Sequence, residues 1–222
     1  MPRRVIAIGD VHGCAAALRT MLERIDPQAD DTIVLLGDCV DRGPDSRGVM
    51  EELLALRERC HLVPLLGNHE EMMLNYLDGR AQPDNWLLCG GMQTMDSYSA
   101  ADGKPQVPPS HVDFMRSWGD YWETDTHFLV HGGYHPNQPL SGQRWHVWRW
   151  HSLRDAIPEP HASGKIAVVG HTSQKAGEVL DVGHLICIDT YCYGGGWLTA
   201  LEPATGQIWQ VDRGGQPRDE SN

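Results

Sequence analysis

Residues 32–43 read Thr-Ile-Val-Leu-Leu-Gly-Asp-Cys-Val-Asp-Arg-Gly, a short apolar run that ends in a polar cluster between two glycines. A continuous apolar run bounded by turn residues is typical of a strand buried on both faces. Two similar runs, Val5–Ile8 and Leu62–Leu66, also end in a glycine followed by a polar residue. The segments between these runs, Ala15–Ile25 and Ser46–Arg59, carry apolar residues at helical spacing. Strands and helices that alternate with short links predict βαβ units and a largely parallel sheet.

The second half of the chain continues the strand pattern. Three apolar runs predict further strands, at His127–Val130, Ile166–Val169 and Leu185–Ile188. Trp197–Leu201 and Gln207–Val211 are joined by a turn that contains proline and glycine, so they predict a closing hairpin.

The region between these two halves has a different character. Prolines and glycines interrupt residues 72–121, and we expect a helical insertion there that lies over one end of the sheet. We expect residues 1–212 to form a single domain. The polar residues 213–222, which include glycine and proline, are expected to form a flexible tail.

Composition excludes several functions. The chain has 222 residues and a formal net charge of −12 at pH 7, which argues against nucleic-acid binding because nucleic-acid phosphates attract basic surfaces. No stretch approaches the length of a transmembrane helix, and the N-terminal apolar run is too short for a signal peptide. The six cysteines form no Cys-x-x-Cys pair, which predicts free thiols in a reducing compartment. We therefore expect a cytoplasmic protein without a nucleic-acid or membrane partner.

Five of the predicted strands end in short clusters of glycine and polar residues. Because the ligand site of an open α/β sheet lies beyond the carboxyl ends of its strands, we expect these clusters to converge. The candidate metal ligands in them are Asp10, His12, Asp38, Asn68, His131 and His171. Mixed oxygen and nitrogen donors suit manganese, iron or zinc better than calcium. Six donors are too many for one catalytic ion with open positions, so the set predicts two divalent ions bridged by one carboxylate.

These five clusters, in this order, resemble the signature of the phosphoprotein phosphatase family of metallophosphoesterases. They read Gly-Asp-Val-His-Gly, Gly-Asp-Cys-Val-Asp-Arg-Gly, Gly-Asn-His-Glu, His-Gly-Gly and Gly-His-Thr. The resemblance runs from about Val5 to about Leu201 and is strongest with small bacterial and bacteriophage serine/threonine phosphatases. Symmetrical diadenosine tetraphosphatases share the same framework. The resemblance implies an α/β fold, a calcineurin-like β-sandwich of mixed sheets flanked by helices.

The resemblance also implies a role for each matching residue. Asp10 and His12 would bind the first ion, Asp38 would bridge both, and Asn68, His131 and His171 would bind the second. His69, oriented by Asp41, would protonate the leaving group, and Arg42 would grip the phosphate with its planar fork. The family usually supplies a second phosphate-binding arginine between the last two clusters. Arg149 is preferred, Arg154 is the alternative, and a third alternative is that Arg42 acts without a second arginine. Manganese is the expected metal, with iron and zinc as alternatives.

The predicted function is metal-dependent hydrolysis of phosphomonoesters, with serine- or threonine-phosphorylated protein as the substrate and a water between the two ions as the nucleophile. A small phosphoester, in particular a symmetrical dinucleoside tetraphosphate, is the alternative substrate on the same metal centre. Glu70 favours the phosphatases, because the tetraphosphatases tend to carry aspartate there. A catalytically silent binding scaffold is an alternative of another class. It would require a missing ligand, and all six candidate ligands are present.

Overall fold

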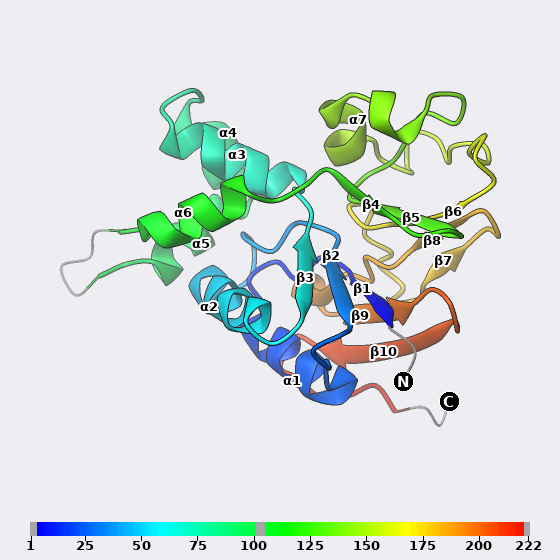
Figure 1. Ribbon diagram of the computed structural model, residues 1–222. Helices are drawn as coiled ribbons and strands as arrows, with labels where there is room; N and C mark the ends of the chain where they lie inside the picture. The colour runs from blue at the N-terminus through cyan, green and yellow to red at the C-terminus, as the bar shows by residue number, and fades with distance from the viewer. Residues whose placement is uncertain (1–3, 101–104, 220–222) are drawn as a thin grey trace.

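The structure, a computed structural model, describes residues 4–100 and 105–219. Its strands form two five-stranded sheets that pack against each other (Figure 1). Both sheets combine parallel and antiparallel pairs, and helices lie on their outer sides. The predicted α/β sandwich of mixed sheets flanked by helices is therefore confirmed. The largely parallel sheet expected from the strand–helix alternation is in fact two sheets, each with three parallel strands.

The first sheet contains the N-terminal strands and the closing hairpin, in the order β10-β9-β1-β2-β3. Its strands are β1 Val5–Ile8, β2 Thr32–Leu35, β3 His61–Pro64, β9 Trp197–Glu202 and β10 Gln207–Asp212. The first three are parallel, and helices α1 (Ala15–Ile25) and α2 (Ser46–Arg57) connect them as predicted. The predicted hairpin is β9 and β10, and β9 pairs antiparallel with β1.

The second sheet has the order β4-β5-β6-β8-β7. Its strands are β4 Tyr121–Glu123, β5 His127–Val130, β6 Ile166–Val169, β7 Leu180–Asp181 and β8 Leu185–Cys187. The three central strands are parallel, and the two edge strands run antiparallel to their neighbours.

Apolar side chains cover both faces of the inner strands, which explains the continuous apolar runs in the sequence. In β2, Ile33 and Leu35 pack with the residues of α1 and α2, whereas Val34 packs with residues of the second sheet. The core between the sheets consists of Ala7, Val34, Leu36, Leu65, Leu129, Val168, Ile188 and Leu201. This shared core holds the carboxyl ends of the parallel strands of both sheets close to one another.

The segment between β3 and β4 contains the predicted helical insertion, at the left in Figure 1. Its elements are α3 Asn68–Leu77, α4 Pro83–Trp86, the π-helical turn η1 Leu87–Gly91, α5 Met92–Ser97 and α6 Pro109–Arg116. The remaining helical segments are η2 Leu140–Gly142, α7 Trp145–Trp150 and η3 Cys192–Gly194. Residues 101–104 lie outside the described part of the chain.

Residues 213–219, in the segment expected to be a flexible tail, fold back along β10. Arg218 donates its backbone N–H to Gln210 O at 3.0 Å, and Val211 forms a bridge with Pro217. The last part of the expected tail, residues 220–222, lies outside the described residues. In the described part of the chain, no helix has both the length and the apolar character needed to cross a membrane.

Candidate metal centre

The six candidate metal ligands converge where the parallel strands of both sheets end. Asp10, His12, Asp38 and Asn68 follow strands of the first sheet, and His131 and His171 follow β5 and β6 of the second. Several residues of these loops have a left-handed backbone, namely His12 (φ 43°), Asp38 (φ 50°), Asp41 (φ 72°), Arg42 (φ 66°) and His171 (φ 62°). Such backbone costs free energy in non-glycine residues and clusters at functional sites.

Asp38 lies at the centre of this cluster. His131 Nε2 is 3.3 Å from Asp38 Oδ1, and His12 Nε2 is 3.5 Å from Asp38 Oδ2. Two groups of possible metal ligands share Asp38: His12 with His69, and His131 with His171. Burial alone would raise the pKa of Asp38, but the surrounding histidines, His131 first, hold it well below its ordinary value. The carboxylate therefore stays ionised and is placed to contact a cation on either side.

The backbone orients two of the imidazole rings toward this centre. His12 Nδ1 lies 2.9 Å from Val40 O, and His131 Nδ1 lies 2.8 Å from Leu36 O. A carbonyl oxygen only accepts, so each Nδ1 donates its proton and the Nε2 of each ring is directed toward Asp38. Metal-binding histidines are commonly oriented in this way, through a hydrogen bond from the other ring nitrogen.

The other donors leave an excess of lone pairs and negative charge. His131 Nε2 is 3.1 Å from Asn68 Oδ1 and 3.2 Å from His171 Nδ1. Burial, followed by His131, lowers the pKa of His171 to about 3, so this ring is neutral. Asp10 accepts the His171 backbone N–H, and burial together with the charges of nearby carboxylates raises its pKa. A divalent cation would relieve both the lone-pair crowding and the carboxylate repulsion, so these residues fit a metal centre.

His69 and Asp41 form a buried hydrogen-bonded pair beside Asp38. His69 Nδ1 lies 2.7 Å from Asp41 Oδ2, and His69 Nε2 lies 3.9 Å from Asp38 Oδ2. Asp41 also accepts hydrogen bonds from Trp86 Nε1 at 2.8 Å and Thr94 Oγ1 at 2.7 Å. Trp86 and Thr94 belong to the insertion, which therefore fixes the carboxylate that orients His69.

Glu70 holds the loop that carries Asp38. Its carboxylate accepts the backbone N–H groups of Asp38, Cys39, Val40 and Gly67, at 2.7–3.3 Å. Burial, followed by the charge of Asp38, raises the pKa of Glu70 to about 7. Because the side chain is fully used by backbone donors, position 70 supports the metal loop and does not face a substrate.

Arg42 lies at the open side of the centre. Its Nη1 donates to His12 Nε2 at 2.9 Å, and its guanidinium carbon lies 4.7 Å from the centroid of the Tyr193 ring. A metal ion on His12 would use the same lone pair, so metal binding and this hydrogen bond exclude each other. Metal binding would therefore free the guanidinium from this hydrogen bond.

The two candidates for a second phosphate-binding arginine lie in different places. A hollow of about 250 Å³ opens onto the centre and is lined by Asp38, Arg42, Arg154, His171, Ser173, Lys175, Tyr191 and Tyr193. Arg149 is not among these residues. Its guanidinium donates to Asp120 Oδ1 at 2.6 Å and to Glu71 Oε2 at 3.3 Å. The hollow therefore brings Arg154, rather than the preferred Arg149, to the metal centre.

Comparison with known proteins gives the family of this chain. The family described as calcineurin-like phosphoesterase matches residues 3–197. The chain belongs to this family.

Two curated relatives of this calcineurin-like phosphoesterase act on different substrates by name. A symmetrical bis(5'-nucleosyl)-tetraphosphatase of Janthinobacterium sp. (strain Marseille) is 34% identical over 133 residues, 59% of this chain and 43% of the relative. Serine/threonine-protein phosphatase 1 of Salmonella typhimurium is 43% identical over 93 residues, 40% of this chain and 39% of the relative. The matches span less than half of either relative, so they establish the family and leave the substrate of this chain open.

Solved structures confirm the fold of this calcineurin-like phosphoesterase. A protein proposed to be a diadenosine tetraphosphatase has a TM-score of 0.72 at 24% identity, with 99% of this chain and 95% of that chain covered. A cold-active protein-tyrosine phosphatase of a Shewanella species has a TM-score of 0.65 at 18% identity, with 97% and 80% covered.

Sequence reasoning missed several residues around the centre of this calcineurin-like phosphoesterase. Asp189 follows β8, is 2% exposed, and accepts a hydrogen bond from Ser173 Oγ at 2.7 Å. It occupies a strand end like the predicted ligands, so the same rule could have found it. Tyr193 and Lys175 carry no comparable signal, because the loops that bring them to the hollow have no periodic pattern.

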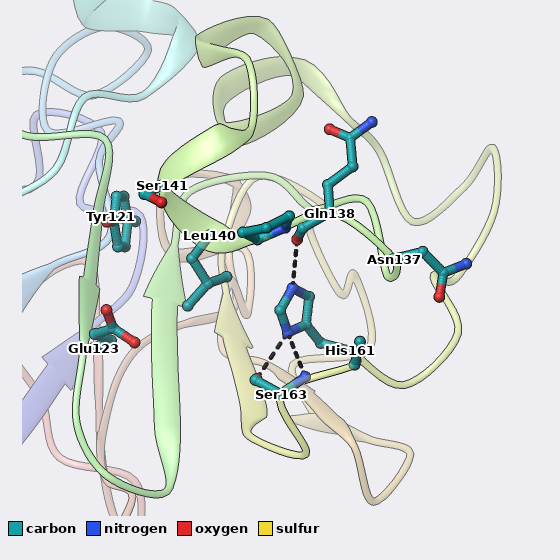
Figure 2. Close-up of a pocket in the computed structure, with 10 residues that line it drawn as sticks. Tyr121, Glu123, Asn137, Gln138, Leu140, Ser141, His161 and Ser163 are labelled. Carbon is teal, nitrogen blue, oxygen red and sulfur yellow. Dashed lines mark hydrogen bonds between the residues drawn. The ribbon is translucent and has the colours of Figure 1, made fainter.

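A larger hollow, of about 430 Å³, lies beside β4 and is shown in Figure 2. His161 is its one histidine, and both of its ring nitrogens have partners: Nε2 lies 2.9 Å from Gln138 O, and Nδ1 lies 2.7 Å from Ser163 Oγ. Glu123 accepts from Lys165 at 2.6 Å. These groups are used to hold loops together, so we assign no chemistry to this hollow.

Proposed function

We propose that this protein is a two-metal phosphomonoester hydrolase, with serine- or threonine-phosphorylated protein as its first candidate substrate. The observation that carries the proposal is the convergence on Asp38 of donor atoms from both sheets. The buried His69–Asp41 pair lies beside this point. The basic side chains of Arg42, Arg154 and Lys175 line the hollow that opens onto it. Metal ligands, a proton donor and phosphate-binding groups are the three parts that phosphoryl transfer to water needs.

We assign the metal ligands from the oxygen and nitrogen donors of the side chains that converge on Asp38. Asp10 and His12 would hold one ion, Asn68, His131 and His171 the other, and Asp38 both. Manganese is the first candidate, with iron and zinc as alternatives, because the donors are mixed oxygen and nitrogen. Two divalent ions bound there would polarise the phosphoryl oxygens and lower the pKa of the attacking water.

The remaining roles belong to the protein itself. His69 donates a proton to the departing alkoxide, and Asp41 keeps the ring in place through the 2.7 Å hydrogen bond. Arg42 binds two oxygens of the phosphate with its planar fork. Arg154 lines the same hollow and replaces Arg149 as the proposed second phosphate-binding arginine, at the wall that it shares with Lys175. The two ion pairs of Arg149 hold α7 against Asp120 and the insertion residue Glu71.

A symmetrical dinucleoside tetraphosphate is the second candidate substrate. One observation favours it: the hollow contains a third cation, Lys175, in addition to the two arginines. A single phosphate bound by two metal ions and Arg42 does not need Arg154 and Lys175 as well. Glu70, which favoured the phosphatases in the sequence, does not separate the two candidates because its carboxylate binds only the loop backbone.

A comparison of kcat/KM tests the proposal. The substrates are a phosphothreonine peptide, bis(p-nitrophenyl) phosphate and diadenosine tetraphosphate, each with added Mn²⁺. We expect the diester to react slowest of the three, because it offers fewer free oxygens and less charge to Arg42 and the metals. A dinucleotide that is better than the peptide by tenfold or more would replace the first candidate by the second. A faster diester would contradict the role of Arg42.

A further inference from the structure

We propose that Lys175 and Arg154 form a second anion subsite beside the metal centre, which binds a phosphate carried by the leaving group. The inference rests on the hydrolytic centre proposed above and extends it to the part of the substrate that departs. In this arrangement Arg42 and the metals bind the transferred phosphoryl group. Lys175, with Arg154, binds the next phosphate along the substrate.

The first observation is that the hollow at the metal centre continues into a second hollow. The hollow at the metal centre shares Arg154, Ser173 and Lys175 with a second hollow of about 510 Å³, which continues to Val179 and Leu180. The two hollows therefore form one groove with a common cationic wall. A substrate whose phosphoryl group lies at the centre could place its leaving group along this groove.

The second observation is that the basic side chains of this groove have no acidic partner in the described part of the chain. In this chain of net charge −12, nine of the lysine and arginine side chains have a carboxylate oxygen within 4.0 Å. Seven of the sixteen lysine and arginine side chains in residues 4–100 and 105–219 have no such oxygen among the described residues, and three of these seven, Arg42, Arg154 and Lys175, line the hollow at the metal centre. Arg154 Nη2 donates to Ser173 O at 3.2 Å, which holds it at the groove without neutralising it. Glu178 also lines the outer hollow, but its carboxylate pairs with Arg218.

The third observation is the conformation and packing of Tyr191. Its φ of 68° is unusual for an aromatic residue, and such backbone persists only where the surroundings enforce it. Its ring lies 5.8 Å from Lys175 Nζ and 4.9 Å from the ring of Tyr193, which in turn packs against Arg42. A Cβ at Gly194 would lie 2.0 Å from the Tyr191 ring, so this loop is closely packed. The two tyrosines form a wall between Arg42 and Lys175.

The position of the two cations favours a phosphate as the ligand. Arg154 and Lys175 line the same hollow as Asp38 and Arg42, and a phosphate joined to the transferred group by one bridging oxygen would lie next to that group. A phosphate within a polyphosphate chain offers two free oxygens, and a terminal one offers three, so both Arg154 and Lys175 can bind it together. The matching leaving group is a nucleoside phosphate or another polyphosphate ester.

The test compares 5′-AMP with ADP, which differ by the phosphate that the subsite would bind. We expect Lys175→Met to lower kcat/KM for ADP about threefold to tenfold more than for AMP, a modest factor because Lys175 is exposed. Comparing the variant with the wild type cancels the different intrinsic reactivity of the two esters. Lys175→Arg should restore the preference, and high salt should weaken it. Lys165→Met is the matched control, because this lysine pairs with Glu123 on the second sheet.

Three outcomes would overturn the subsite. One is an equal effect of Lys175→Met on AMP and ADP. Another is equal affinity of metal-free wild type and variant for ADP in isothermal titration. The third is a larger effect on a phosphoserine peptide with a neighbouring glutamate than on ADP, which would assign the subsite to a carboxylate. Failure of the proposed function appears differently, as the absence of Mn²⁺-dependent hydrolysis of p-nitrophenyl phosphate by the wild type.

Discussion

At the scale of single residues, His69 has a defined geometry for proton transfer, with Nδ1 bonded to Asp41 and Nε2 facing Asp38. We expect His69→Gln to lower the turnover of alkyl phosphates by roughly 10²–10⁴, the usual range for general acid catalysis. The loss should be smaller for p-nitrophenyl phosphate, because nitrophenolate leaves without a proton. Steady-state kcat for both esters measures this, with the exposed His146→Gln as the control. Equal losses for the two esters would contradict the acid role.

The sequence predicted residues whose position follows from a strand end, and failed where position depends on distant partners. Asp10, Asp38 and His131 lie one to three residues beyond the ends of their strands, so their convergence follows from the arrangement of the strands. The choice between Arg149 and Arg154 depends on where Glu71 and Asp120 lie, far away in the sequence. No local pattern contains that information.

At the scale of elements, the insertion contacts the site through its backbone at Gly90 as well as through Trp86 and Thr94. Arg42 N donates to Gly90 O at 3.1 Å, Gly90 has a φ of 117°, and a Cβ there would lie 2.6 Å from Arg42 N. We expect Gly90→Ala to displace Arg42 and lower kcat/KM roughly tenfold to hundredfold. Gly79→Ala is the matched control, since its φ is 68° and nothing lies within 4 Å of its Cβ. Similar kcat/KM values for the two variants would show that the insertion does not position Arg42.

The first strand is fixed to the turn before β2 by Arg4 and Asp31. Arg4 Nε donates to Asp31 at 3.1 Å, and the Gln28 N–H donates at 2.9 Å. Burial alone would raise the pKa of Asp31, but these hydrogen bonds hold it below its ordinary value. A lowered folded-state pKa means that the stabilisation is complete above the unfolded-state pKa, about 3.9, and is lost as the pH falls through the folded-state pKa.

Asp31→Asn should therefore lower the free energy of unfolding by about 1 kcal/mol at pH 6, a value limited by the partly exposed Arg4. The difference from the wild type should shrink below roughly pH 4. Urea unfolding at both pH values measures it. A difference that stays constant down to pH 3 would show that the ionised carboxylate is not the source.

The elements marked by an apolar run or a helical repeat were predicted well, and the short edge strands were not. Helix α1 and strands β1, β5 and β6 have the predicted bounds, because such a pattern spans each of them. Strands β4 and β7 have three and two residues, too few to show a period, and pairing at the sheet edge alone defines them. Helix α2 ends at Arg57 rather than Arg59, because the backbone N–H groups of Glu58 and Arg59 donate to the carbonyl oxygens three residues earlier, as in a 3₁₀ turn.

At the scale of the whole molecule, the candidate metal centre is a junction between the two sheets. Asp10, Asp38 and Asn68 follow strands of the first sheet, whereas His131 and His171 follow strands of the second. The junction also gathers buried carboxylates in a chain that already carries a net charge of −12. Cations bound there would join the sheets and neutralise part of this charge, so metal binding and folding are expected to be coupled.

This coupling predicts a large effect of metal on thermal stability. A ligand that binds only the folded state at 100 times its Kd stabilises that state by about 2.7 kcal/mol, which corresponds to roughly 5–10 °C in Tm for a chain of this size. We expect Mn²⁺ to raise the Tm of chelator-treated protein by that amount, as followed by circular dichroism. Asp38→Asn should lose most of the increase because it removes charge from both sites, whereas Asp113→Asn, at an exposed carboxylate, should keep it. An unchanged Tm in the wild type would show that the six residues hold no metal under these conditions. A full increase in Asp38→Asn would show that Asp38 does not bridge the two ions.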